Sequence, residues 1–416
     1  MKVLLVNHSD TAGGASVVTH RLLDALCELG VDARMLVVHK NGDSLRVGAA
    51  ASGVRRKIPF LLEHADIFRH NGFRRDTLFR ISTARYGLPL HRHPWVRQAD
   101  IVVLNWINQG MLSLRTVKRI AALKPVVWTM HDQWNMTGVC HYTSQCRRWM
   151  SDCCHPCPLV GRGSLARKIF EAKRRLYADT NIRFVAVSHA LADLCRSSAL
   201  MAGCDISVIP NAFPVDSFPV EPSLSRHDIG LPDSGRIIVM GAARLDDPVK
   251  NLPLAVELLN TVADTTFGHF TPVFFGHLRD RSILQRLAMP YLWMGPVADH
   301  NRLQSLFAHA DIVLSTSVWE TLPGTVVEGV SCGAYAITTD NGGQRDIIVS
   351  PSIGRLIGAK NAVSQFSEAM ESYEAYSDTV SRGERHKAMA AKFSAHAVAR
   401  AYVNLFHQIL NTDSTH

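Results

Sequence analysis

Two carboxylates in the last third of the chain are spaced to act on a ligand that carries hydroxyl groups. Glu320 and Glu328 lie eight residues apart on either side of Pro323-Gly324, and the apolar run 312–315 precedes them. This order predicts a strand, a turn and a helix that begins with Pro323, a residue suited to the first helical position. A helix N-terminus offers free N–H groups to an anion. The segment therefore predicts a site for an anionic, hydroxyl-bearing ligand.

The alternative is that Glu320 and Glu328 are two solvated glutamates beside a helix start, because pairs at this spacing are common by chance. Cations elsewhere favour the functional interpretation. Arg244 and Lys250 follow the first apolar strand of the second half, at 237–240. Fixed cations can stabilise the negative charge of a leaving group without a metal ion. Asp246 and Asp247 could indicate a metal site, but the two cations make a metal unnecessary.

Two segments of the first half also end strands where a ligand could bind. His131 leaves the buried run 126–130, although a lone histidine is more often structural. Gly13 and Gly14 follow the first strand and precede a helical pattern at 16–29, so the backbone there can approach a phosphate or a sugar closely. A lone glycine pair is usually just a turn. Each of these segments alone is weak evidence for a binding site, and the evidence is stronger when they are considered together.

The elements that must position these residues alternate between short apolar strands and helical stretches, as in a parallel α/β sheet. Strands are expected at 3–7, 33–38, 101–105, 126–130 and 184–187, and in a second series at 237–240, 273–275, 292–294, 312–315 and 335–338. Prolines cluster at 205–233, which indicates a connector between two domains. We expect domains at 1–208 and 209–396, with a helix at 397–410 that packs back on the first. The basic stretch 50–95 is expected to be helix or loop.

Taken together, the strand–Pro-Gly–helix segment and its partners resemble the Glu-x7-Glu signature of retaining glycosyltransferases of family GT4. The segment Asn341-Gly342-Gly343 resembles the family's Gly-Gly loop, although Gln344 and Asp346 stand where a glutamate is often found. The resemblance implies an α/β fold of the GT-B type, with two doubly wound Rossmann-like domains that face a central cleft. It implies catalytic roles for His131 and Glu320. The donor-binding residues that it implies are Gly13, Gly14, Arg244, Lys250, Leu322, Pro323, Gly324, Thr325 and Glu328.

This resemblance is nearest to enzymes that build exopolysaccharides such as colanic acid. It implies transfer of a sugar from a nucleotide-sugar donor, with retained configuration, to a lipid-linked or other oligosaccharide acceptor. No cofactor is expected for catalysis and no nucleic acid as a partner. Two alternatives remain open: a GT-B epimerase that acts on nucleotide sugars, and a non-catalytic protein that binds lipid or nucleic acid.

Five cysteines fall within 18 residues: Cys140, Cys146, Cys153, Cys154 and Cys157. Such density in a reducing compartment favours a structural zinc ion held by four thiolates. Only Cys154 and Cys157 have the Cys-x-x-Cys spacing, so packed thiols or a disulfide-bonded loop remain alternatives.

Composition and charge limit the class of protein and its expected cellular location. Apolar residues make up 47% of the chain and charged residues 19%, which describes a globular protein and excludes a disordered one. No apolar run reaches the roughly 18 residues that span a bilayer, and the N-terminus resembles a strand more than a signal peptide. A cytoplasmic protein is expected. Its net charge of +9, with arginines dense in 55–97 and 162–175, predicts an anionic membrane surface as a partner, with a solvated basic face as the alternative.

Overall fold

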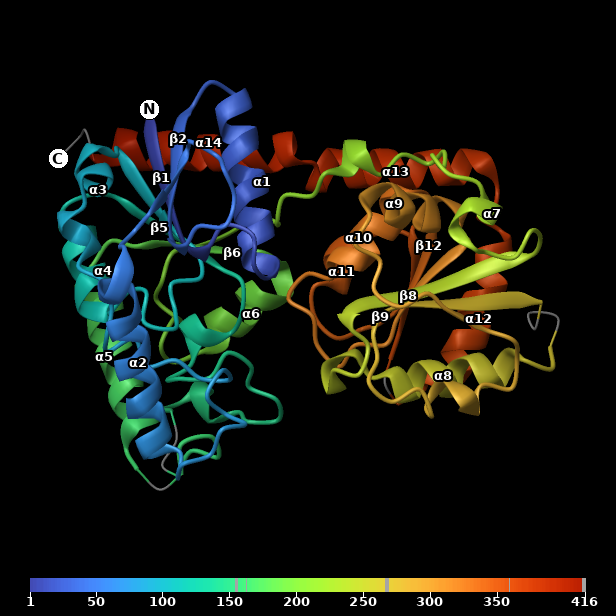
Figure 1. Ribbon diagram of the computed structural model, residues 1–416, viewed down its shortest axis with the longest axis horizontal. Coiled ribbons are helices and arrows are strands. Elements are labelled where there is room, and N and C mark those ends of the chain that lie inside the picture. Colours follow the sequence, from blue (N-terminus) through green and yellow to red (C-terminus); the bar gives the residue numbers. More distant parts are fainter. Residues whose placement is uncertain (154–155, 162, 266–268, 359, 414–416) are drawn as a thin grey trace. The chain divides into compact units, whose positions relative to one another are not determined.

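The computed structural model describes all residues except 154–155, 162, 266–268, 359 and 414–416. The chain divides into two compact units: Met1–Ala212 together with Val398–His416, and Phe213–Ala397. Each unit is an α/β body built on one parallel sheet (Figure 1). The division falls within four residues of the boundary that the prolines indicate, and the end of the chain returns to the first unit.

The first unit contains a seven-stranded parallel sheet in the order β3-β2-β1-β4-β5-β6-β7. The inner strands β1, β4 and β5 carry almost unbroken apolar runs because helices cover both faces of a parallel sheet. The chain order reverses between β1 and β4, and ligands of doubly wound sheets bind at such a reversal. The strands are β1 (Lys2–Ser9), β2 (Asp32–His39), β3 (Val47–Ala49), β4 (Ile101–Leu104), β5 (Val126–Met130), β6 (Arg183–Ala186) and β7 (Ile206–Val208).

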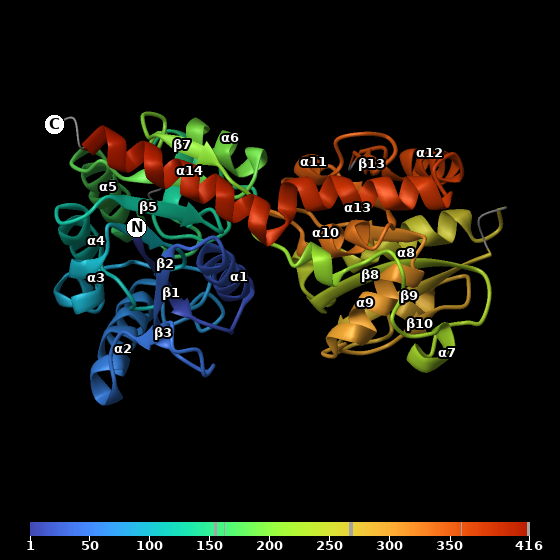
Figure 2. The same ribbon diagram turned by 90° about the horizontal axis from the view of Figure 1, so that it is seen from above.

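Seven α-helices of the described residues belong to this unit wholly or in part. The last, α14, lies along the unit (Figure 2), and the hydroxyl groups of Tyr402 in α14 and Thr129 in β5 are hydrogen-bonded at 2.8 Å. This bond attaches the predicted C-terminal helix to the sheet. The helices are α1 (Gly14–Glu28), α2 (Gly53–His70), α3 (Pro94–Gln98), α4 (Leu114–Ala121), α5 (Leu165–Ala178), α6 (His189–Ser197) and α14 (Ala395–Asp413).

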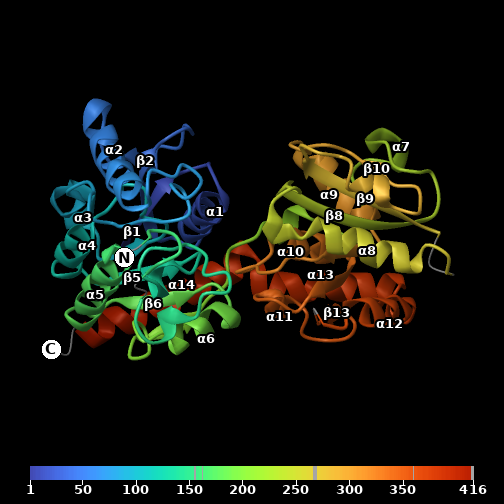
Figure 3. The same ribbon diagram turned by 90° about the horizontal axis from the view of Figure 1, so that it is seen from below.

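The stretch 50–95, for which the sequence allowed helix or loop, contains the long helix α2. Figures 2 and 3 show α2 projecting from the edge of the first unit. Pro59 lies inside this helix. The helix leaves apolar side chains exposed, among them Val54 at 71% and Ile58 at 48%. Packing within the described structure therefore does not explain why these exposed positions of α2 are apolar.

The second unit contains a six-stranded parallel sheet in the order β10-β9-β8-β11-β12-β13. Here the reversal lies between β8 and β11. The strands are β8 (Arg236–Arg244), β9 (Phe270–His277), β10 (Leu292–Trp293), β11 (Ile312–Ser315), β12 (Tyr335–Thr339) and β13 (Gly354–Ile357). The helices are α7 (Arg226–Ile229), α8 (Leu252–Val262), α9 (His300–His309), α10 (Gly324–Ser331), α11 (Gln344–Ile347), α12 (Ala362–Glu374) and α13 (Thr379–Phe393).

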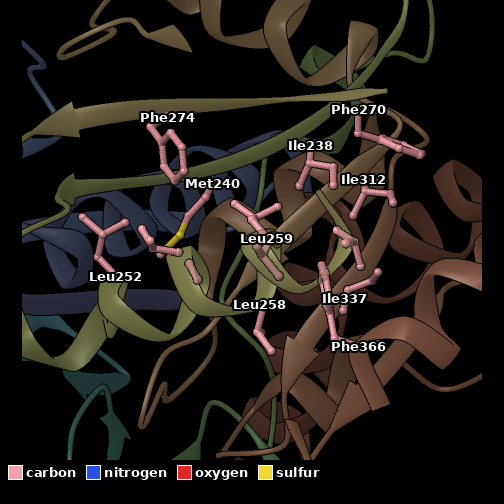
Figure 4. Close-up of a cluster of buried hydrophobic side chains, with 14 of the residues drawn as sticks. Ile238, Met240, Leu252, Leu258, Leu259, Phe270, Phe274, Ile312, Ile337 and Phe366 are labelled. Carbon is pink, nitrogen blue, oxygen red and sulfur yellow. The ribbon is translucent and has the colours of Figure 1, made fainter. Parts of the chain in front are cut away.

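The core of the second unit lies where α8 and α12 pack on one face of this sheet. Figure 4 shows Leu252 and Leu259 of α8 against Met240 of β8, and Phe366 of α12 near Ile337 of β12. These side chains are buried to within a few per cent of full coverage. The core fixes the strands whose carboxyl ends carry the predicted site.

Candidate active site

The loops that follow β8 and β11 meet at the strand-order reversal of the second unit. Lys250 ends the 3-10 turn Pro248–Lys250 after β8, and its ammonium group forms an ion pair with the carboxylate of Glu320, which follows β11. The backbone joins the two loops as well, because Val318 N donates to the carbonyl of Val249 at 2.8 Å. The structure thus places a predicted donor-binding cation beside a predicted catalytic carboxylate.

A second set of contacts fixes the position of Glu320. The Ser317 hydroxyl donates to Glu320 Oε1 at 2.9 Å. The backbone N–H of Glu320 donates to the carbonyl of Asn341 at 3.1 Å, and Gly343 N donates back to the carbonyl of Glu320 at 2.9 Å. A Cβ atom on Gly342, where φ is +122°, would lie 2.2 Å from the Glu320 carbonyl oxygen. The Gly-Gly loop therefore consists of glycine because only glycine lets it approach Glu320 this closely.

The turn after Glu320 leads directly into α10. Pro323 is the N-cap, with φ −73° and ψ 107°, and the helix begins at Gly324. The expectation that Pro323 occupies the first helical position is wrong by one residue, because its ψ is extended. Leu322 and Pro323 are buried, whereas Gly324 and Thr325 are half-buried. Since Pro323 supplies no side-chain cap, the first N–H groups of α10 are free of a capping side chain.

Glu328 lies in the second turn of α10 and is half-buried, so a ligand at the helix N-terminus could reach its carboxylate. Arg244 ends β8 with 53% of its side chain exposed, and its Nε donates to Asp246 Oδ1 at 3.2 Å. That hydrogen bond lowers the pKa of the Asp246 carboxyl. The roles assigned to Glu328 and Arg244 stay predictions.

His131 follows β5 in the first unit. Its Nε2 donates to Asn105 Oδ1 at 3.0 Å, beyond the end of β4. Nδ1 is buried and makes no hydrogen bond of good geometry among the described residues, although the Asn211 side chain lies near enough to the ring to raise its pKa slightly. Burial lowers the pKa of His131 to about 4. The imidazole is therefore neutral at pH 7 and presents a buried acceptor nitrogen. A neutral ring can orient a hydroxyl group but cannot supply a positive charge.

Gly13 and Gly14 lie at the N-terminus of α1, where Gly13 is the N-cap with φ +89°. Both glycines are exposed, and a Cβ on either would have no neighbour within 4 Å. The positive φ explains glycine at position 13, while the open space at 14 leaves room for a ligand. Their part in donor binding stays a prediction.

A polar network next to His131 was missed from the sequence. Asp132 Oδ2 accepts from Trp106 Nε1 at 3.0 Å and from His141 Nδ1 at 2.7 Å. The His141 Nε2 lies 3.0 Å from the Ser82 hydroxyl. Burial alone would raise the pKa of Asp132, but His141 and the hydrogen bonds lower it below its usual value. The sequence offered only one signal, an aspartate directly after a strand end.

The cysteine-rich segment packs as an apolar cluster in the described residues. Cys140, Cys153 and Cys157 are buried, and Cys146 is half-buried. Burial raises the pKa of the Cys140 and Cys153 thiols to about 12, so both are protonated at pH 7. Within the described ranges, no three His, Cys, Asp or Glu side chains are placed to hold a metal ion. Cys154 lies outside the described residues. Both the structural zinc and the packed-thiol alternative therefore stay predictions.

Sequence comparison finds two family profiles that together cover most of the chain. The profile described as Glycosyltransferase Family 4 matches residues 12–217, and the one described as Glycosyl transferases group 1 matches residues 235–374. A protein of Escherichia coli (strain K12), which carries the name colanic acid biosynthesis glycosyl transferase WcaC, is 22% identical over 431 residues. The alignment covers 98% of this chain and all of that protein.

Solved structures show the same fold. Sucrose-phosphate synthase from Thermosynechococcus elongatus matches with a TM-score of 0.67 at 13% identity, over 99% of this chain and 100% of that one. Anabaena HepE in complex with UDP-glucose matches with a TM-score of 0.60 at 15% identity, over 98% and 100%. The expected α/β fold class of GT-B type, with two doubly wound sheets, is confirmed.

The close approach of the Gly-Gly loop to Glu320 generates a first prediction. Gly342→Ala should lower the free energy of unfolding by about 2 kcal/mol or more, because the new Cβ meets the Glu320 carbonyl and the backbone has a positive φ. Urea unfolding measures this. The matched control is Gly383→Ala in α13, where a Cβ has no neighbour within 4 Å and alanine is the better helix former. Equal stability of Gly342→Ala and the parent would contradict the argument.

A second prediction concerns acid stability. The unfolded chain protonates histidine near pH 6.5, whereas folded His131 takes the proton only at about pH 4. Stability should therefore fall as the pH drops from 6.5 towards 4, by about 1.4 kcal/mol per pH unit for this residue. His131→Gln removes that contribution, so the slope of unfolding free energy against pH should be shallower by about this amount. Parallel slopes for parent and variant between pH 6 and pH 4.5 would refute it.

Proposed function

The chain belongs to the GT4-type glycosyltransferases, and from that premise we propose that it transfers a sugar from a nucleotide-sugar donor to a saccharide acceptor in polysaccharide assembly. The observation that carries this proposal is the Lys250–Glu320 pair beside the uncapped N-terminus of α10. A cation, a helix N-terminus and a carboxylate at one strand-order reversal match the diphosphate and the sugar hydroxyls of such a donor. The named relatives support the same assignment, since HepE was solved with UDP-glucose and WcaC is named for colanic acid biosynthesis.

We assign the donor contacts as follows. The diphosphate lies at the N-terminus of α10, with Lys250 and Arg244 as its counter-charges, and Glu328 accepts hydrogen bonds from the ribose. When the diphosphate arrives, the Lys250 ammonium exchanges Glu320 for phosphate, and the Glu320 carboxylate turns to the hydroxyls of the sugar. Lys250, Arg244 and the N–H groups of α10 are then already in place to stabilise the negative charge that develops on the leaving diphosphate. Such preorganised electrostatic stabilisation is usually the largest single contribution to the rate.

We propose that the sugar is transferred with retained configuration and that the leaving phosphate accepts the proton of the acceptor hydroxyl on the same face. Two observations support this mechanism over a covalent intermediate. Glu320 Oε1 accepts from the Ser317 hydroxyl and, once the donor is bound, the carboxylate is used by the hydroxyls of the sugar, whereas His131 is neutral and bonded to Asn105. Neither side chain has the free, activated form that a nucleophile needs.

The acceptor is proposed to be lipid-linked and the protein to bind the surface of an anionic membrane. Support comes from α2, where the exposed apolar residues Val54 and Ile58 lie one helical turn apart and Arg55 is exposed beside them. An apolar stripe flanked by cations is typical of helices that lie in a membrane interface. No helix in the described part of the chain has the length and apolar character needed to cross a bilayer.

Turnover tests the donor assignment. Lys250→Ala should lower kcat for nucleoside diphosphate release by about 10²-fold or more, because a fixed charge on the leaving group is lost. Activity should persist in EDTA. Lys387→Ala, an exposed lysine of α13 away from the site, is the control. Loss of activity in EDTA that magnesium or manganese alone restores would show that a metal compensates the diphosphate. A donor epimerised without any acceptor would favour the epimerase instead.

Vesicle binding tests the membrane assignment. Val54→Ser with Ile58→Ser should lower partitioning onto anionic vesicles about tenfold, because apolar side chains no longer enter the interface. Binding by the parent should also weaken with salt. Val380→Ser, at an exposed valine of the second unit, is the matched control. Equal partitioning of the parent onto neutral and anionic vesicles would reject the assignment.

A further inference from the structure

A cavity of about 260 Å³ lies in the first unit, where the carboxyl ends of β1 and β2 meet α2. Its lining combines polar side chains with the apolar residues Val38, Phe60 and Leu61. The lining residues are His8 of β1, Val38 and His39 of β2, Arg56, Lys57, Phe60 and Leu61 of α2, and Gln109 and Gly110 from the loop after β4. The residues that line this cavity are different from those assigned to donor binding. The cavity lies entirely within the first unit.

Gln109 is built into this cavity at a conformational cost. Its side chain belongs to a residue only 4% exposed, and its backbone has φ +57°, a region that residues with side chains rarely adopt. The amide Nε2 donates to the Ser82 hydroxyl at 3.3 Å, whereas Oε1 is buried without a hydrogen-bond partner among the described residues. A buried acceptor without a partner destabilises the fold unless a ligand satisfies it.

The polar network described above agrees with this orientation of the amide when His141 is neutral. The Asp132 carboxylate can only accept, so a neutral His141 donates to it from Nδ1 and accepts at Nε2, where the Asn108 amide also lies at 3.4 Å. The Ser82 hydroxyl then donates to His141 Nε2, and its oxygen is left to accept from Gln109 Nε2. Gln109 Oε1 is therefore the atom left for the cavity.

His8 supplies a second acceptor. Its Nδ1 is buried without a hydrogen-bond partner in the described structure. Burial, with His39 nearby, lowers the pKa of His8 to about 4, so the ring is neutral and one of its nitrogens is an acceptor. Opposite these acceptors, Arg56 Nε is also buried without a hydrogen-bond partner in the described residues, and Lys57 is exposed.

We propose that this cavity is a subsite for an acidic saccharide, a sugar that carries a carboxylate or phosphate group. Sugar hydroxyls donate to Gln109 Oε1 and His8 Nδ1, the anionic group pairs with Arg56 and Lys57, and the apolar face of the ring lies on Phe60. The inference rests on the proposed function, because this saccharide is part of the acceptor. It adds the chemical class of the acceptor, which the donor site leaves open.

Calorimetry with small sugars tests the subsite. Methyl β-D-glucuronide and glucose 6-phosphate should bind at least tenfold more tightly than methyl β-D-glucoside. Arg56→Gln should remove this preference, and Arg55→Gln, at the exposed neighbour that does not line the cavity, should keep it. Binding of one acidic sugar alone supports the subsite and identifies its anion as carboxylate or phosphate.

A second variant reports on the acceptor atom. Gln109→Glu keeps the shape of the side chain but adds a negative charge, so it should weaken the acidic sugars at least tenfold and leave the neutral glucoside within about twofold. Loss of fold alone would weaken all the sugars and would not remove the preference for the acidic ones selectively. If this variant does not fold, the Arg56→Gln and Arg55→Gln pair still decides.

Several outcomes would overturn the subsite: equal affinity for acidic and neutral sugars, unchanged binding by Arg56→Gln, or inorganic phosphate that binds as tightly as glucose 6-phosphate. Donor cleavage is measured separately with a panel of nucleotide sugars. Acidic-sugar binding without donor cleavage would reject the proposed function and keep the subsite. Donor cleavage with no acidic-sugar preference would reject the subsite and keep the proposed function.

Discussion

The ion pair between Lys250 and Glu320 is the interaction on which the candidate active site depends. Both side chains are mostly covered, so each would be a costly charge without the other. The pair joins the loops after β8 and β11, and the Gly-Gly loop after β12 then fixes the Glu320 backbone. Three strand ends are thereby held in one arrangement before any ligand is present. A phosphate that replaces Glu320 as the partner of Lys250 substitutes one negative charge for another, so the Lys250 ammonium group keeps a counter-charge throughout.

Most of the fold could be predicted because buried parallel strands carry apolar runs that depend little on their surroundings. The inner strands of both sheets lie where the sequence placed them. The edge strands β3, β7 and β13 were missed, since they are only three or four residues long and partly exposed. The helix α2 was ambiguous for a different reason. Its apolar side chains face outward, and Pro59 within the helix is a residue that usually ends one, so neither periodicity nor composition identified α2.

The candidate site was predictable only where its residues are neighbours in sequence. Glu320, Pro323 and Glu328 share one turn and one helix, so their spacing carries the signal. The network of Asp132, His141 and Ser82 has no such local pattern, because Ser82 and His141 are 59 positions apart and meet only in the folded chain. Gln109 could not be identified from the sequence at all, because what distinguishes it is a buried Oε1 atom without a hydrogen-bond partner among the described residues.

The continuous helix α14 has a consequence for how the molecule is made. It begins at Ala395, in the second unit, and from Val398 onward belongs to the first. The second unit is thus an insertion inside the first, and the ribosome completes it before the last helix of the first unit emerges. Until Tyr402 reaches Thr129, the nascent first unit lacks a covering helix on its sheet. The insert can fold as soon as it is synthesised, whereas the unit synthesised earliest is the last to be finished.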